Sequence, residues 1–429
     1  MNVPAASRRL LAAVAAVVVA AVALATDASA QSVMDSIAKL PGNQAERDVR
    51  ARLAPERLAA LPAGVRATWE AYIARSRRAL ARDTALMNAE LRSVGRAVMT
   101  RAPFVRQSFV LDSTMTDAWM RGAEARRVAE VMLSYQTPSG GWSKHVDLRQ
   151  APRAPGQSFF SENEQWQYIA TIDNGSTTSQ MTFLARLDAA QPDARYRAAF
   201  VRGVRYLLDA QYPNGCWPQV YPLQGGYHDN ATFNDDAIVN AATTLRQVGA
   251  GRPAFVPGAL RRRAAAAAAH AVDCLLAAQA RVNGALTIWP QQADPLSLVP
   301  TDARSYEHAS LTAKESVPVL LFLLAIPRPG ARVVGAVHAA SDYLERTKIM
   351  DLAYDNQVES RRVGAGPIWA RMTEIGTDRP IFSNRDGIIL YDWNKLTDRR
   401  EGYGWYTDLP VAFRAVYPAW AQRHPRGAP

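Results

Sequence analysis

Residues 196–219 read YRAAFVRGVRYLLDAQYPNGCWPQ, an amphipathic helix pattern that runs into a loop broken by proline and glycine. The same unit returns over residues 261–291 as RRRAAAAAAHAVDCLLAAQARVNGALTIWPQ, and an earlier copy ends in another tryptophan loop. The loop tryptophans Trp142, Trp217 and Trp289 are spaced by 75 and 72 residues. This regular spacing predicts a repeat of helical hairpins with every aromatic loop in the same phase.

A second helix is predicted between successive loops, because apolar residues there recur at helical spacing. Its three copies are TTSQMTFLARLDAA at 177–190, DAIVNAATTLRQV at 236–248 and HASLTAKESVPVLLFLLAI at 308–326. Each amphipathic pair needs neighbours to bury its apolar face, so we expect the repeat to close on itself. The predicted fold is all-α: an (α/α) toroid, or barrel of repeated helical hairpins, with long irregular loops forming a cleft at one end. Only IFSNRDGIILYDW, at 381–393, predicts a short β-hairpin.

Residues 1–30 predict a secretory signal peptide. Arg8 and Arg9 precede an apolar run that ends at Ala25, and a small-residue cleavage site ends at Ala30. A membrane anchor is the alternative, but the run is shorter than the roughly 20 apolar residues that a membrane-spanning helix needs. We therefore expect cleavage after Ala30, a secreted or periplasmic protein, and no membrane attachment after the signal is removed.

Composition divides the remaining chain in two. Residues 31–98 are rich in Ala, Leu, Arg and Glu and predict a helical N-terminal extension that packs on the toroid. Residues 99–429 are expected to form the toroid itself, the domain that carries the functional site. The chain has 50 Lys and Arg against 39 Asp and Glu, a formal net charge of +11. Because the arginines are scattered over helices, an anionic polysaccharide is favoured over nucleic acid as partner. Separately, we expect the protein to be a monomer. On charge alone, an arginine-rich composition without such a partner is the alternative.

Several common chemistries lack their motifs in this sequence. It contains no H-E-x-x-H, no paired C-x-x-C, no nucleophile elbow and no phosphate-binding loop, which excludes most zinc, serine and nucleotide chemistries. Cys216 and Cys274 are the only cysteines. Export permits a disulfide, but the sequence leaves open whether these two residues form a bridge or remain buried thiols.

Acidic residues and an asparagine precede two of the predicted helices. Asp173 and Asn174 lie before one helix, and Asp235 and Asp236 lie before the next. Acids at such positions commonly cap a helix and complement its dipole. Two adjacent acids beside an aromatic loop favour instead a cation or sugar site, and the spacing alone does not decide which. Carboxylates that converge with an amide oxygen are ligands that Ca²⁺ accepts.

Five motifs in order resemble those of the pectate lyases of polysaccharide lyase family 10: TIDNGST, YPNGCWPQVYPLQGGYHDNATFNDDA, ARSYEHASL, FSNRDG and REGYGWY. The similarity runs from about Trp69 to the C-terminus. It implies an (α/α) toroid and Ca²⁺-assisted β-elimination of α-1,4-polygalacturonate, which gives 4,5-unsaturated oligogalacturonides. It also implies an arginine base, which by motif position is Arg385.

The resemblance assigns roles to further residues by their motif positions. Asp173 is implied as a catalytic residue and as a ligand of Ca²⁺, together with Asn174 and Asp235. The implied substrate-binding residues are Arg304, Arg371, Lys144, Trp217 and Tyr221.

Two other functions remain open from the sequence. The first is a glycoside hydrolase on the same toroid, with two of Asp173, Asp235 and Asp236 as acid and base. The second is an inactive uronan-binding protein that keeps the aromatic residues and arginines as a cleft. An ultraviolet-absorbing unsaturated product that requires a divalent cation distinguishes the lyase from both.

Overall fold

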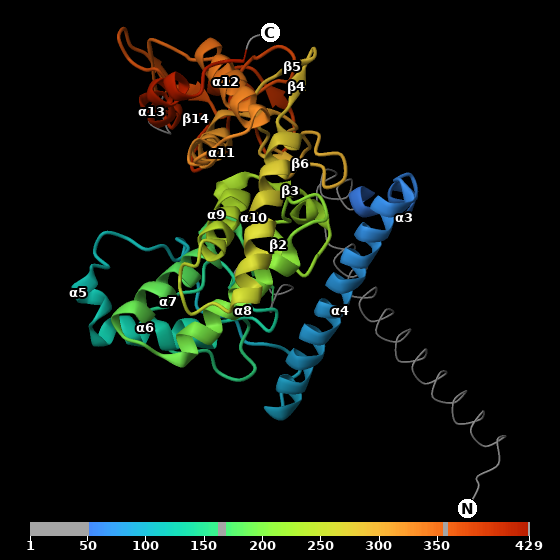
Figure 1. Ribbon diagram of the computed structural model, residues 1–429, viewed down its shortest axis with the longest axis vertical. Coiled ribbons are helices and arrows are strands. Elements are labelled where there is room, and N and C mark those ends of the chain that lie inside the picture. The colour runs from blue at the N-terminus through green and yellow to red at the C-terminus, as the bar shows by residue number, and fades with distance from the viewer. Residues whose placement is uncertain (1–50, 162–168, 355–358, 428–429) are drawn as a thin grey trace, which may run out of the picture.

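The computed structural model describes residues 51–161, 169–354 and 359–427, which form an elongated arrangement of helices joined by long loops (Figure 1). The α-helices are α3 (Pro55–Ala59), α4 (Ala63–Ser93), α5 (Asp117–Met120), α6 (Ala123–Ser134), α7 (Thr178–Ala190), α8 (Ala194–Ala210), α9 (Ala237–Gly249), α10 (Gly258–Ala278), α11 (Ala313–Leu324), α12 (Ala331–Arg346) and α13 (Pro410–Arg423). The 3₁₀ turns are η1 (Ala51–Leu53), η2 (Asp173–Gly175), η3 (Gly226–Asp229), η4 (Asn234–Asp236) and η5 (Trp393–Lys395).

Short strands accompany these helices. They are β1 (Ala170–Thr171), β2 (Val220–Tyr221), β3 (Ala231–Thr232), β4 (Arg281–Val282), β5 (Ala285–Leu286), β6 (Gln292–Ala293), β7 (Leu311–Thr312), β8 (Leu352–Tyr354), β9 (Glu359–Arg361), β10 (Trp369–Ala370), β11 (Met372–Thr373), β12 (Phe382–Ser383), β13 (Ile389–Leu390) and β14 (Tyr406–Thr407). The pairs are antiparallel: β1 with β2, β3 with β6, β4 with β5, β7 with β11, β8 with β9, β10 with β14 and β12 with β13. The last pair confirms the hairpin predicted at 381–393.

The tryptophan repeat marks a recurring connection between a helix and the loop that follows it. Each loop tryptophan is buried and donates its indole N–H to a backbone carbonyl in the preceding long helix, and Trp369 is a fourth copy that the sequence pattern did not reveal. The four bonds run from Trp142 to Met132 (2.8 Å), Trp217 to Leu207 (2.7 Å), Trp289 to Leu275 (2.6 Å) and Trp369 to Leu344 (2.6 Å). A buried indole N–H needs such an acceptor, so these tryptophans anchor the loops to α6, α8, α10 and α12.

The loop after α8 approaches α10 closely. Gly215 has φ 89°, and a Cβ atom at this position would lie 2.2 Å from the backbone oxygen of His270, so only glycine fits. The next residue, Cys216, forms a disulfide with Cys274 in α10, with their Cα atoms 5.3 Å apart. The disulfide decides the question that the sequence left open.

The prediction of an all-α toroid is wrong. Helices α5 to α7 lie at one end of the molecule and α11 to α13 at the other (Figure 1). The described residues also form seven two-stranded sheets, several of which tie one repeat loop to the next. The repeat in the sequence predicts that each hairpin packs against its neighbours. It does not predict whether the last hairpin packs against the first to close a ring.

Helix α4 lies along one side of the molecule, separate from the helical pairs (Figure 1). Trp69 packs on Tyr212 with ring centroids 5.0 Å apart, and the Tyr72 hydroxyl donates to the Ala210 carbonyl at 3.0 Å. The amphipathic pattern predicted for this part of the chain therefore forms a helix whose apolar face covers the end of α8. The division of the chain at residue 98 stays a prediction.

The predicted signal peptide, residues 1–30, lies outside the described residues. No helix in the described ranges is both long enough and apolar enough to cross a membrane.

Candidate active site

Two short turns bring the predicted acids together. Asp173 and Asn174 lie in η2, directly before α7, and Asn234 and Asp235 lie in η4, directly before α9. Asn174 has φ 51° and Asp235 has φ 49°, a left-handed conformation that Asn and Asp adopt more readily than most residues. The side chains of these four residues all line one cavity.

The acids do not cap the helices that follow them. Thr177 is the N-cap residue of α7 and Asp236 that of α9, and neither side chain accepts a capping hydrogen bond. Burial raises the pKa of Asp236 to about 6. The acids therefore do not act as helix caps in this structure.

The turns border a small polar cavity of about 70 Å³, called the acidic cavity below. Its lining side chains are acids, amides, one lysine, one arginine and one tyrosine. They are Lys144, Asp173, Asn174, Gln219, Tyr227, Asn234, Asp235, Gln292, Arg304 and Glu307.

Amide groups link the two carboxylates across the cavity. The Asn234 Nδ2 donates to Asp173 Oδ1 at 3.4 Å and to Asp235 Oδ2 at 2.9 Å. Asn174 Nδ2 also donates to Asp235 Oδ2, at 3.0 Å. Oxygen atoms from two helix-preceding turns thus face one small volume.

Lysines compensate the charge of both carboxylates. Lys144 Nζ lies 2.7 Å from Asp173 Oδ2, and Lys314 Nζ lies 3.2 Å from Asp235 Oδ1. Burial by itself would raise the pKa of Asp173, but Lys144 and Arg304 help to outweigh it, and the pKa lies below the ordinary value. Asp173 is therefore held in its ionised form.

Arg304 enters the same cavity with a carboxylate partner of its own. Its Nε lies 2.7 Å from Glu307 Oε2, and Glu307 is 3% exposed. Burial would lower the pKa of Arg304, yet the ion pair with Glu307 outweighs it and raises the pKa above the ordinary arginine value. The partly exposed guanidinium stays charged and presents a cation to the cavity.

The cavity offers a metal ion oxygen atoms from acidic and amide side chains. Within the residues that the structure describes, no three or more His, Cys, Asp or Glu side chains gather to hold a metal. Asp173, Asp235 and the amide oxygen of Asn174 are nevertheless hard oxygen ligands of the kind Ca²⁺ takes. They fit a calcium site whose remaining ligands come from water or a bound carboxylate.

The family model for pectic acid lyase matches residues 136–413 of this chain. The chain belongs to this family. A comparison with curated proteins found no match. Among solved structures, the chain is similar to the family 10 polysaccharide lyase from Cellvibrio cellulosa, with 33% sequence identity and a TM-score of 0.62. The match covers 74% of this chain and 99% of the other. A mutant of that enzyme in complex with trigalacturonic acid gives the same identity, TM-score and 74% coverage, with 100% of its chain covered.

Trp217 and Tyr221 lie in the core of this lyase, although the sequence predicted both as substrate-binding residues. Their exposed fractions are 0% and 3%, and neither residue lines the acidic cavity. Trp217 is the helix anchor described above, and the Tyr221 ring packs against Tyr72 and Tyr206. The resemblance implied substrate contacts at both positions, but the rings fill the core behind the repeated loops.

Two of the three predicted arginines lie outside the cavity lining. Arg371 is buried beneath it and bonds Glu315, while Arg385 is exposed on the turn between β12 and β13. A Cβ atom added at Gly387, on the same turn as Arg385, would lie 3.4 Å from the backbone oxygen of Ser305. The turn therefore lies beside the segment that carries Arg304, at the side of the cavity.

Several residues at the cavity were missed from the sequence: Gln219 and Gln292 line it, and Lys314 lies outside the lining but pairs with Asp235. Lys314 stands at the start of α11, the third copy of the helix that follows Asp173 and Asp235 in the earlier repeats. This repeat position was a signal that pointed to Lys314. Gln219 lies two residues after Trp217, as Lys144 lies two residues after Trp142, so the repeat also pointed to Gln219. Gln292 carried no such signal, because the pairing of β3 with β6 brings it to the cavity.

Proposed function

We propose that this lyase cleaves α-1,4-polygalacturonate by calcium-assisted β-elimination and releases 4,5-unsaturated oligogalacturonides. The observation that supports the proposal is the pairing of Asp173 and Asp235 through Asn234, in a cavity that also holds Lys144 and Arg304. The carboxylates suit a cation, and the lysine and arginine suit the carboxylates of a uronan. The relative in complex with trigalacturonic acid is consistent with this substrate class.

The chemical demand of the reaction matches these side chains. The proton removed from C5 of a galacturonate is α to its carboxylate, so negative charge develops on that carboxylate during proton transfer. Lys144 and Arg304 would stabilise the developing charge where it appears. Asp173, Asn174 and Asp235 would hold Ca²⁺, which when bound adds positive charge beside the same carboxylate.

We assign the base to Arg385 from its motif position, with Arg304 as the competing arginine. Arg385 lies on an exposed turn that can meet a substrate, whereas Arg304 lines the cavity but is held in its charged form by Glu307. A free arginine stays protonated over the ordinary pH range, so a guanidinium base requires neighbouring positive charge that disfavours its protonated form. We therefore expect activity that rises into the alkaline range.

The lyase is proposed to act outside the cytoplasm, after cleavage behind Ala30, as a monomer. The signal-like residues 1–30 support export, and the Cys216–Cys274 disulfide suits an oxidising compartment. Size-exclusion chromatography of protein purified from the periplasm or the medium, with mass analysis of its N-terminus, tests both statements.

The reaction class has a direct spectroscopic test. Purified protein is incubated with polygalacturonate at alkaline pH, with Ca²⁺ and then with EDTA, while the ultraviolet absorbance of the 4,5-unsaturated product is followed. We expect an absorbance increase that stops with EDTA and returns with added Ca²⁺. New reducing ends without this absorbance would show a hydrolase, and binding of the polymer without either product would show an inactive uronan-binding protein.

A further inference from the structure

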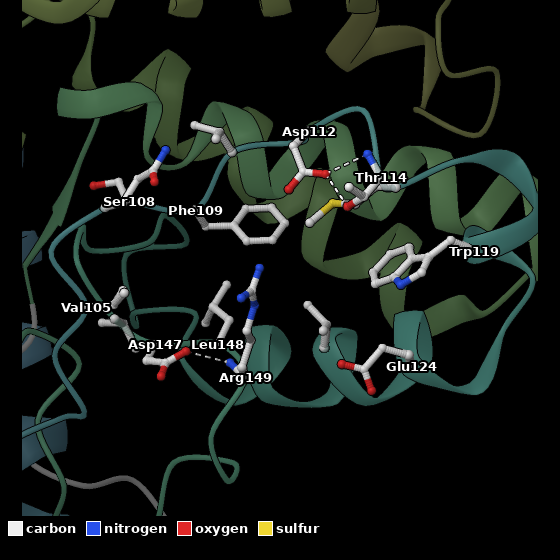
Figure 2. Close-up of a pocket in the computed structure, with 15 residues that line it drawn as sticks. Val105, Ser108, Phe109, Asp112, Thr114, Trp119, Glu124, Asp147, Leu148 and Arg149 are labelled. Carbon is white, nitrogen blue, oxygen red and sulfur yellow. Dashed lines mark hydrogen bonds between the residues drawn. The ribbon is translucent and has the colours of Figure 1, made fainter.

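A second cavity lies between residues 105–115, helices α5 and α6, and residues 146–149 (Figure 2). Its volume is about 510 Å³, compared with about 70 Å³ for the acidic cavity. Pockets that hold small molecules commonly measure roughly 300 to 1,000 Å³. None of the side chains assigned to the elimination reaction lines it, so the proposed function does not explain it.

Aromatic and aliphatic side chains form the walls of this cavity. The rings of Phe109 and Trp119 face the hollow in Figure 2. Both rest on the buried ring of Phe183, with centroid distances of 5.4 Å and 6.2 Å. Leu148 and Val128 are buried and complete the apolar wall. The shared contact with Phe183 fixes the orientation of the two rings.

Charged side chains surround the apolar wall. Asp112, Glu124 and Asp147 line the cavity together with Arg149, whose side chain reaches into the space between them (Figure 2). Among the residues that the structure describes, none forms a hydrogen bond or ion pair with the Arg149 guanidinium. Three carboxylates thus face one guanidinium that is available to a ligand.

At least two of these carboxylates are ionised near neutral pH. Hydrogen bonds from Thr114 lower the pKa of Asp112 below its ordinary value. The Glu124 carboxylate accepts two hydrogen bonds from Arg127, at 2.6 Å and 2.9 Å, and these lower its pKa as well. The cavity therefore combines flat apolar rings with fixed hydrogen-bond acceptors and a net negative lining.

We propose that this cavity binds a short uncharged saccharide. A pyranose ring has a C–H face that packs on Phe109 and Trp119, and its hydroxyls donate to carboxylates and accept from Arg149. A uronide would place its own negative charge among three carboxylates, which repel it. A purely apolar ligand would remove these carboxylates from water without replacing their hydrogen bonds.

One segment of the chain joins this saccharide site to the acidic cavity. Lys144 lines the acidic cavity, and Asp147, Leu148 and Arg149 line the saccharide site a few residues further on. A uronan that carries neutral sugars would be able to occupy both places at once. The proposal for the saccharide site nevertheless stands on its own lining and does not require elimination activity.

Calorimetric titration of the purified protein tests the proposal. The probes are galactotriose, arabinotriose and cellotriose, each titrated separately at millimolar concentrations, with trigalacturonate as the charged comparison. We expect saturable binding of at least one uncharged trisaccharide, weakened roughly tenfold or more by Arg149→Ala and by Glu124→Gln, because each removes a charged hydrogen-bond partner. Arg121→Ala, an exposed arginine outside the cavity, is the matched control and leaves binding unchanged.

Three results would overturn the inference. The first is the absence of saturable binding for all three uncharged trisaccharides. The second is binding that Arg149→Ala and Glu124→Gln leave unchanged. The third is binding of trigalacturonate alone, with the same sensitivity to these variants. Arg149→Ala retains wild-type elimination of unbranched polygalacturonate, so failure of the saccharide site and failure of the proposed lyase activity are observed separately.

Discussion

Arg371 donates from its guanidinium to Asn234 Oδ1 at 3.0 Å, from a side chain that is only 4% exposed. Asn234 in turn donates to Asp173 and Asp235, two of the carboxylates that line the acidic cavity. Burial would lower the pKa of Arg371, but Glu315 and neighbouring groups outweigh it and raise the pKa. Arg371 is therefore a charged positioning residue that orients Asn234 from below.

Arg371→Lys is expected to lower kcat/KM roughly 10- to 100-fold, as loss of an outer-shell partner commonly does. Lysine keeps the charge but cannot bond Glu315, Asn234 and the Tyr403 carbonyl together. Steady-state kinetics on polygalacturonate measure the effect, and Arg379→Lys, at an exposed position, is the matched control. Wild-type kcat/KM in Arg371→Lys would contradict the positioning role.

Asp235→Asn is expected to weaken Ca²⁺ binding and to lower kcat roughly 100-fold or more, the scale of losing an electrostatic stabiliser of the transition state. The substitution removes one of the two carboxylates while it preserves the size of the side chain. Calorimetric titration with Ca²⁺ gives a readout besides activity, and Asp117→Asn, whose side chain is 83% exposed, is the control. Unchanged affinity for Ca²⁺ in Asp235→Asn would move the metal site elsewhere.

Lysine variants of the two candidate arginines separate base from substrate binding. Arg385→Lys is expected to lower kcat roughly 100-fold or more with little change in KM, because a general base acts in the chemical step. Arg304→Lys is expected mainly to raise KM, because the cavity loses a planar partner for a carboxylate. The opposite division of effects in pH-dependent kinetics would assign the base to Arg304.

The pKa of Asp229 predicts how stability depends on pH. Burial raises this pKa from its ordinary value of 3.8 to about 7, despite hydrogen bonds from the Gln224 and Gly225 backbone N–H groups. The folded state therefore binds more protons than the unfolded state between about pH 4 and 7, so this contribution to stability falls as pH rises through that window. Above about pH 7 the loss is complete.

Asp229→Asn removes this dependence. Compared with the variant, the wild-type protein is expected to lose a few kcal/mol of unfolding free energy between pH 4 and pH 8. Urea unfolding of both proteins across this range measures the difference, in which contributions from other groups cancel. A difference that does not vary with pH would show that Asp229 keeps its ordinary pKa in the folded protein.

Two glycines with similar backbone angles test the close approach of the loop to α10. Gly284→Ala, at φ 82° with nothing near the added Cβ, is expected to cost about 1 kcal/mol of unfolding free energy from backbone strain alone. Gly215→Ala, at φ 89° and 2.2 Å from the His270 oxygen, is expected to cost several times as much. Similar melting temperatures for the two variants would show that the loop moves aside without cost.

Periodicity in the sequence predicted the helical hairpins and their loops correctly, because amphipathic spacing and glycine breaks are local properties of the chain. The resemblance of the motifs implied Trp217 and Tyr221 as substrate-binding residues, but both are buried in the core. A local pattern marks an aromatic residue near a loop, but it does not say which face of the loop meets the core. Trp217 is buried against α8 and donates its indole N–H to the Leu207 carbonyl, so it anchors the loop to that helix.

By itself, the sequence determined the repeat and the order of its motifs, and the resemblance of those motifs to a known family implied Asp173, Asn174, Asp235, Lys144 and Arg304, which line one cavity. Only the tertiary structure decided that the hairpins form an open series, that Arg371 lies beneath the cavity, and that Cys216 meets Cys274. These features depend on packing between segments far apart in the chain. Helical periodicity constrains each segment but not the partner against which it packs.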